Sequence, residues 1–149
     1  MKKAISLFIA ICLLLSGCGK EIKIDVNAFA DELLNSVSYE DELSLIDNEM
    51  AFLIHDVSED VTSIAVYLGS LATAEEIAVF EAKDNTSAKK VLEKLNEYVG
   101  NKRDEYQDYI PKEVKRIDNA IVEQNGKYIV LCITNDTENA KNVIGKYFN

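Results

Sequence analysis

Apolar positions recur along this chain with two spacings, one typical of helices and the other typical of strands. From residue 26 to residue 37 they return every third or fourth position behind Asp25, which predicts an amphipathic helix with Asp25 as its N-cap. Asp47 precedes a shorter segment of the same kind, and Asp136 precedes the last one. We therefore expect one or two helices near the start of the domain and one at its end.

The clearest helical pattern lies in the middle of the chain. An apolar stripe from Ala88 to Val99 follows Asp84 at helical spacing, and the pattern continues through Gly100. Pro111 ends this pattern, because the residue before a proline disfavours the helical backbone. These positions predict a helix that continues towards Tyr106 and Tyr109.

Two pairs of strands flank this helix. The segments VTSIAVYL (61–68) and IAVFEA (77–82) are rich in β-branched and aromatic residues, which favour strands. Two apolar runs in AIVEQNGKYIVLCIT (120–134) surround Asn125-Gly126, a dipeptide suited to a type I′ hairpin turn. The order strand–strand–helix thus occurs twice. It predicts an α+β fold, with a mainly antiparallel sheet of about four strands and the helices packed on one face.

The two strand–strand–helix segments also resemble each other in sequence. IAVFEAKDNTSAKKVLEK (77–94) matches IVLCITNDTENAKNVIGK (129–146) at a constant offset, which places Asp84 opposite Asp136. One interpretation is a duplicated unit. The other is convergence, because any strand, cap and helix in this order needs similar residues. Duplication is the interpretation we favour, and both predict the same architecture.

The N-terminus has the pattern of an export signal. The first three residues, MKK, are basic, and residues 4–15 carry no charge but are too few to span a membrane, which takes roughly 18 apolar residues. The following LSGC (15–18) resembles the lipobox of bacterial lipoproteins. That resemblance implies cleavage after Gly17 and a diacylglyceryl group on the sulfur of Cys18. The alternative is an ordinary secreted protein in which Cys18 is incidental.

These features divide the chain into a signal peptide (1–17) that is removed, a lipidated tether (18–23) and a single domain (24–149). Two acyl chains hold a protein stably at a bilayer, whereas one holds it only marginally. We therefore expect a protein anchored by lipid to the extracytoplasmic face of a bacterial cell membrane. Cys132 would be its one free cysteine, and the apolar surroundings of Cys132 predict a buried core residue.

Charge is concentrated in the first half of the predicted domain. The chain carries a net charge of −10, and residues 24–82 contain fourteen Asp and Glu but no Lys or Arg. Nucleic-acid binding is not expected, since it needs a basic surface. Either the acidic region is a solvated face that keeps the protein soluble, or it receives a cationic protein, peptide or ion.

No catalytic or cofactor-binding constellation stands out. His55 is the only histidine, no serine lies in a nucleophile elbow, and Cys and His are too few for a zinc site. An EF-hand-type calcium loop is also missing. We assign no catalytic residue, cofactor or metal ligand. Six residues are candidates for contact with a partner: Glu40, Asp41 and Glu42 in an acidic turn, Leu71 in a loop of small residues, and Tyr106 and Tyr109 near the end of the long helix.

The stretches TAEEIAVFEAKD (73–84), YQDYIP (106–111) and GKYIVLCITNDTENAKNVI (126–144) resemble small bacterial lipoproteins grouped as domain-of-unknown-function family 4358. The resemblance covers most of residues 18–149 and implies no activity, cofactor or catalytic residue. Our leading hypothesis is a membrane-tethered, non-enzymatic binding or interaction module.

The alternative hypothesis is a cell-envelope enzyme whose site is built from scattered carboxylates and His55. A deep pocket holding His55 beside two carboxylates would favour the enzyme. A flat acidic face around residues 39–60 would favour the binding module.

Overall fold

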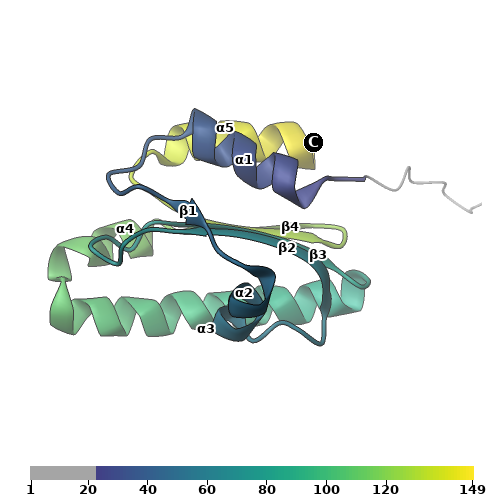
Figure 1. The fold of residues 1–149 in the computed structure, drawn as a ribbon, viewed down its shortest axis with the longest axis horizontal. Coiled ribbons are helices and arrows are strands. Elements are labelled where there is room, and N and C mark those ends of the chain that lie inside the picture. Colours follow the sequence, from purple (N-terminus) through teal and green to yellow (C-terminus); the bar gives the residue numbers. More distant parts are fainter. Residues whose placement is uncertain (1–22) are drawn as a thin grey trace, which may run out of the picture.

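A computed structural model describes residues 23–149 and contains one five-stranded antiparallel sheet (Figure 1). The predicted signal peptide and Cys18 lie outside these residues. The strands, in their order across the sheet, are β1 (Ser44–Leu45), β2 (Val61–Leu68), β3 (Glu76–Ala82), β5 (Tyr128–Ile133) and β4 (Ile121–Asn125). The predicted α+β class and antiparallel sheet are confirmed, and the sheet has one more strand than we expected.

Helices cover both faces of the sheet, as Figure 1 shows. One face carries α1 (Val26–Ser36) and α5 (Thr137–Phe148); the other carries α2 (Asn48–His55), α3 (Asn85–Tyr109), the 3₁₀ turn η1 (Pro111–Glu113) and α4 (Val114–Asp118). Our expectation that the helices share one face is therefore wrong. The inner strands β3 and β5 carry apolar residues on both faces, apart from Glu76 and Glu81 of β3, so they need cover on both sides.

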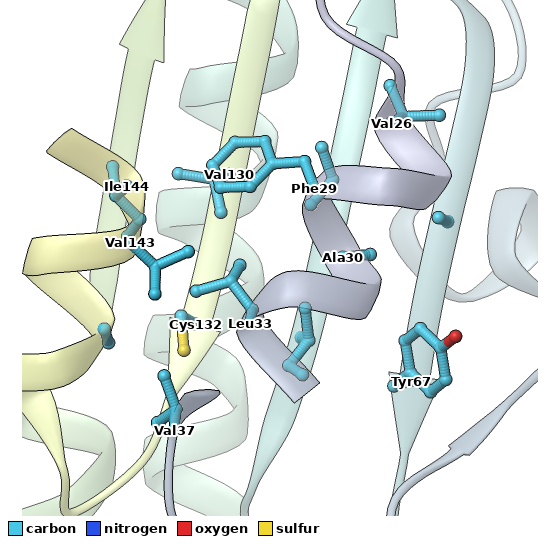
Figure 2. Packing of buried hydrophobic residues seen from close by; sticks show 14 of the residues in the cluster. Val26, Phe29, Ala30, Leu33, Val37, Tyr67, Val130, Cys132, Val143 and Ile144 are labelled. Atoms are coloured by element: carbon cyan, nitrogen blue, oxygen red, sulfur yellow. The ribbon is translucent and has the colours of Figure 1, made fainter. Parts of the chain in front are cut away.

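Each face of the sheet has its own hydrophobic core. Phe29 and Leu33 of α1 and Val143 of α5 pack against Val130 and Cys132 of β5 (Figure 2). On the other face, residues of α3 and α4 pack against alternate residues of the same strands. Cys132 is fully buried, as predicted, and burial raises the pKa of its thiol to about 12. It is a core residue.

The two strand–strand–helix units are not equivalent in space. β3 and β5 are antiparallel neighbours, and β2 and β4 lie on their outer sides. A rotation that superposes the β2–β3 hairpin on the β4–β5 hairpin therefore does not exchange the two faces of the sheet. If the units were copies, α3 and α5 would lie on the same face. Instead, α3 and α5 lie on opposite faces (Figure 1). The sequence offset also pairs Ile77, which faces α1 and α5, with Ile129, which faces α3. The structure thus contradicts duplication and supports convergence.

Most predicted boundaries are confirmed by local hydrogen bonds. The carboxylates of Asp25, Asp47 and Asp84 accept backbone N–H groups at the starts of α1, α2 and α3. Asp136 instead accepts the backbone N–H of Ser38, at 3.1 Å, and the side chain of Asn139. It therefore joins the start of α5 to the segment that follows α1.

The β4–β5 hairpin is confirmed, but its turn lies one residue later than predicted. Asn125 pairs with Tyr128, so Gly126 and Lys127 are the two central residues. Of these two residues, only Gly126 has a positive φ, at 57°. This excludes the predicted type I′ turn, which needs two positive φ values, and matches the glycine-first pattern of type II′.

Candidate binding surface

Three loops and the segment that joins α3 to α4 meet at the end of the sheet opposite the start of α1 (Figure 1). This loop end comprises residues 37–43, 69–75, 106–116 and 134–136. The Tyr106 hydroxyl donates to the carbonyl of Thr73 at 2.8 Å, and the Thr134 hydroxyl donates to the carbonyl of Ser38 at 2.9 Å. Segments from all parts of the domain are thus tied together by side chains.

A buried arginine holds the loop end together. The Arg116 guanidinium forms ion pairs with Glu113 and Glu40, and its Nε atom lies 3.7 Å from Glu75. Arg116, Glu75 and Glu113 are all buried. The Glu75 carboxylate also accepts the backbone N–H groups of Glu40 and Asp41, each at 2.9 Å. We call these four residues (Arg116, Glu40, Glu75 and Glu113) the Arg116 cluster, and its bonds fix the loops in position.

The turn after β2 is held by Asp41. One oxygen of the Asp41 carboxylate accepts both the backbone N–H and the hydroxyl of Ser70, at 2.7 and 2.8 Å, and these bonds lower the pKa of Asp41. A Cβ atom at Gly69 would lie only 2.4 Å from this carboxylate, so any larger residue there would displace the Asp41 side chain. Leu71 follows with a positive φ of 69°, and its side chain is 68% exposed.

Beside this turn, the surface is hollowed along the β1 edge of the sheet. The edge hollow encloses about 670 Å³. Its lining consists of Asp41, Glu42, Ser44, Ile46, Leu68, Gly69, Ser70 and Leu71. The carboxylate of Glu42 is exposed and makes no ion pair with any residue from 23 to 149. The hollow thus combines an apolar floor with an acidic rim.

A second hollow, of about 660 Å³, lies against α2 directly after β1. It is lined by Asp47, Glu49, Met50, Phe52, Leu53, Asp56 and Ser58. Within the described part of the chain, five large apolar side chains are exposed. Four of them lie along the β1 edge and the two hollows beside it: Leu45, Met50, Leu53 and Leu71. Neither hollow is lined by a lysine or an arginine.

His55 belongs to a closed polar network inside the domain. Its Nε2 atom lies 2.7 Å from the Glu76 carboxylate, and its Nδ1 atom lies 2.9 Å from the carbonyl of Ala51. Tyr98 and Lys102 donate to the other oxygen of Glu76, at 2.8 and 2.6 Å. We call His55, Glu76, Tyr98 and Lys102 the Glu76 network. The side chains of His55 and Glu76 have no exposed surface.

Electrostatics keep Glu76 ionised in this buried position. Burial alone would raise the pKa of the Glu76 carboxyl, but the Lys102 ammonium and the hydrogen bond with His55 outweigh it. The pKa of Glu76 is therefore lowered to about 2.

His55 lines neither of the two hollows and contacts one carboxylate rather than two.

The six candidate residues gather at the loop end, in different roles. Glu40 and Asp41 hold loops together, and Tyr106 is half-buried, so burial raises the pKa of its hydroxyl. Glu42 and Leu71 are exposed at the edge hollow. Tyr109 is 86% exposed at the end of α3.

Sequence reasoning did not identify Ile46 and Leu68 as lining residues, or Lys102 and Arg116 as buried cations. The one available signal was a run of apolar residues around Ile46 that fits no helix. The described residues contain no group of three or more His, Cys, Asp or Glu side chains placed to hold a metal ion. None of the helices in the described part of the chain combines the length and the hydropathy of a membrane span.

Comparison with known protein families assigns the chain to one of them. The model of a domain of unknown function, DUF4358, matches residues 35–134, and the protein belongs to this family. The matched segment contains β1 to β5, α2 to α4 and the residues of both hollows. No curated protein and no solved structure matches the chain.

Proposed function

We propose that this protein is a lipid-anchored extracytoplasmic lipoprotein that binds a partner through its exposed β1 edge and performs no catalysis. The observation that carries this proposal is the edge itself, where apolar side chains are exposed among unpaired carboxylates. Gathered apolar groups with a polar rim are typical of interaction sites. The sequence supports the anchor through the lipobox resemblance at Cys18.

The direction in which the chain enters the domain supports binding away from the bilayer. The described chain enters the domain through residues 23–25, which lead into α1, and the loop end lies at the other end of that helix (Figure 1). A helix of 11 residues spans about 16 Å. A tether attached before α1 would therefore hold the loop end and its edge on the side of the domain away from the membrane.

The geometry of residues 23–149 offers no support for the enzyme alternative. Both ring nitrogens of His55 are occupied, and the carboxylate beside His55 is occupied by Lys102 and Tyr98. A general base needs a free position within hydrogen-bond reach of its substrate. The carboxylates of the Arg116 cluster are likewise engaged by an arginine and by backbone N–H groups.

Two measurements test the proposal. For the anchor, cells are fed labelled fatty acid, and we expect the wild-type chain to be labelled and Cys18→Ala to lose the label. Cys132→Ala is the matched control and should keep it. Equal labelling of wild type and Cys18→Ala would contradict the lipid anchor.

For the binding role, crosslinking on intact cells should trap the protein with a specific extracytoplasmic partner. The same cells expressing Cys18→Ala show whether this capture depends on the anchor. Turnover of an envelope substrate by the purified full-length protein, together with an absence of crosslinked partners, would overturn the proposal.

A further inference from the structure

We propose that the edge hollow receives an extended, cationic segment of a protein partner. An apolar side chain of that segment would lie against Ile46, Leu68 and Leu71, and a neighbouring lysine or arginine would lie beside Glu42. This inference rests on the proposed binding function, because it states where the partner docks and what kind of chemistry it presents.

The first argument is the conformation of Leu71. Its positive φ is disfavoured for residues with a side chain, and a glycine would form the same turn without strain. The leucine side chain is also mostly exposed, so packing within the domain does not account for it. The Asp41 bonds to Ser70 hold the turn in place. An exposed apolar group on a turn that is held by hydrogen bonds is well suited to contact a partner, because little backbone freedom is lost on binding.

The second argument is charge, which selects the kind of partner. Asp41 is engaged by Ser70, Asp47 caps α2, and Asp56 pairs with Lys94. Glu42 and Glu49 make no ion pair with any residue in the described part of the chain. This face therefore carries negative charge that nothing in the domain balances, and complementary charge on a partner favours association.

The same charge disfavours the other occupants. Anionic lipid and nucleic acid would be repelled. A second copy bound through the same face would bring Glu42 and Asp41 of both copies together, because a two-fold interface uses the same patch twice. A cationic polypeptide satisfies both the apolar floor and the acidic rim of the hollow.

The third argument is that β1 is an open edge. Ile46 donates its backbone N–H to Val66 of β2, so the backbone groups of Leu45, one residue earlier, point away from β2. An extended segment can therefore lie alongside β1, as in strand addition. With only two residues in β1, side chains must supply most of the specificity.

The test uses the full-length protein in micelles of a non-ionic detergent and three fluorescently labelled, capped pentapeptides. The first peptide is Lys-Lys-Leu-Lys-Lys. The second has serine in place of the leucine, and the third has glutamate in place of every lysine. Fluorescence anisotropy is measured against empty micelles. We expect the first peptide to bind at least ten-fold more tightly than the other two. Leu71→Gly should weaken its binding about ten-fold and Glu42→Gln about three- to five-fold.

The matched control is Glu93→Gln, which removes an exposed carboxylate from α3, far along the chain from the hollow, and should change nothing. Equal binding by wild type and Leu71→Gly would overturn the inference. Binding of the glutamate peptide, or an absence of binding above empty micelles, would overturn it as well.

A second measurement separates this inference from the proposed function. The photocrosslinker p-benzoylphenylalanine replaces Leu71, Tyr109 or Asn142 in the full chain, and crosslinked products are collected from intact cells. Products from position 71, whose crosslinked segment contains lysine or arginine beside an apolar residue, support the inference. Products only from position 109 or 142 would overturn it and leave the binding function in place. No product at any position would contradict both.

Discussion

The Glu76 network and the edge hollow both place carboxylates beside apolar side chains, but they differ in how those carboxylates are satisfied. Glu76 is fully buried and contacts His55, Tyr98 and Lys102 at hydrogen-bond distance. Glu42 is exposed, pairs with no residue in 23–149, and lies beside an exposed leucine. The first region is complete within the domain. The second leaves both its charge and its apolar surface unmatched.

This difference separates structural polar groups from groups available for binding. A buried carboxylate with all its partners present links β3 to α2 and α3 and has no position left for a ligand. An unpaired carboxylate at the rim of an apolar hollow gains its partner only when another molecule arrives. The predictions below test that distinction, beginning with the largest expected effect.

Removing the charge of Glu76 should be the most damaging change. Glu76→Gln leaves the buried Lys102 ammonium without its counter-charge, and breaking a buried ion pair in this way costs about 3–5 kcal/mol. Glu42→Gln is the control and should alter the free energy of unfolding by less than about 0.5 kcal/mol. Urea unfolding followed by circular dichroism measures both. Equal losses from the two variants would contradict the structural role of the network.

Acid should weaken the fold through the same residue. The folded-state pKa of Glu76 lies below its usual value of 4.5, so its contribution is complete above about pH 5 and is lost as pH falls towards 2. Glu32, Asp41, Asp84 and Asp136 also have lowered pKa values and act in the same direction. The free energy of unfolding, measured from pH 7 to pH 2, should fall less steeply for Glu76→Gln. Parallel curves for the two proteins would count against this assignment.

The Asp41 turn should be sensitive to a single methyl group. Gly69→Ala places a Cβ atom against the Asp41 carboxylate, which must move and lose its bonds to Ser70, at a cost of about 1–3 kcal/mol. Gly100→Ala is the matched control, because outside the backbone of its own helix no atom of another residue would lie within 4 Å of the new Cβ. It should stabilise α3 by about 0.5–1 kcal/mol. Thermal unfolding of both variants measures these changes in stability. A Gly69→Ala variant as stable as the wild type would refute the close contact between residue 69 and Asp41.

Replacing Leu71 should be the mildest change to stability. Leu71→Gly relieves the left-handed backbone, so the free energy of unfolding should stay the same or rise by up to about 1 kcal/mol. Leu53→Gly removes another exposed leucine, but from the helix α2, and should cost about 1 kcal/mol. Chemical denaturation of both variants measures the contrast. A clear loss of stability in Leu71→Gly would assign its side chain a packing role.

Much of the fold could be predicted because its elements are locally encoded. Asp25, Asp47 and Asp84 each precede a stripe of apolar residues, so cap and periodicity agree on where the helices begin. The faces that the helices cover could not be obtained in this way. The signal for cover on both sides was the unbroken apolar run of β5 and the apolar run of residues 77–80 in β3.

The candidate site could be predicted only in part. Leu71 and Glu42 stood out as an apolar residue among small ones and as part of an acidic turn. Ile46 and Leu68 become lining residues only when β1 pairs with β2, a contact between short segments more than twenty residues apart. The burial of Lys102 depends on Glu76 of β3. The burial of Arg116 depends on Glu40 and Glu75 as well as on the nearby Glu113, so the sequence around each residue is not enough to indicate it.

The most direct test of the difference between the two regions is a map of where a cationic peptide binds. Amide chemical shifts of the full-length ¹⁵N-labelled protein in non-ionic micelles are recorded during titration with Lys-Lys-Leu-Lys-Lys. We expect shifts at residues 41–46 and 68–71, and none at His55 or Glu76. Shifts centred on His55 and Glu76, with the edge hollow unchanged, would contradict the assignment of that hollow as the binding surface.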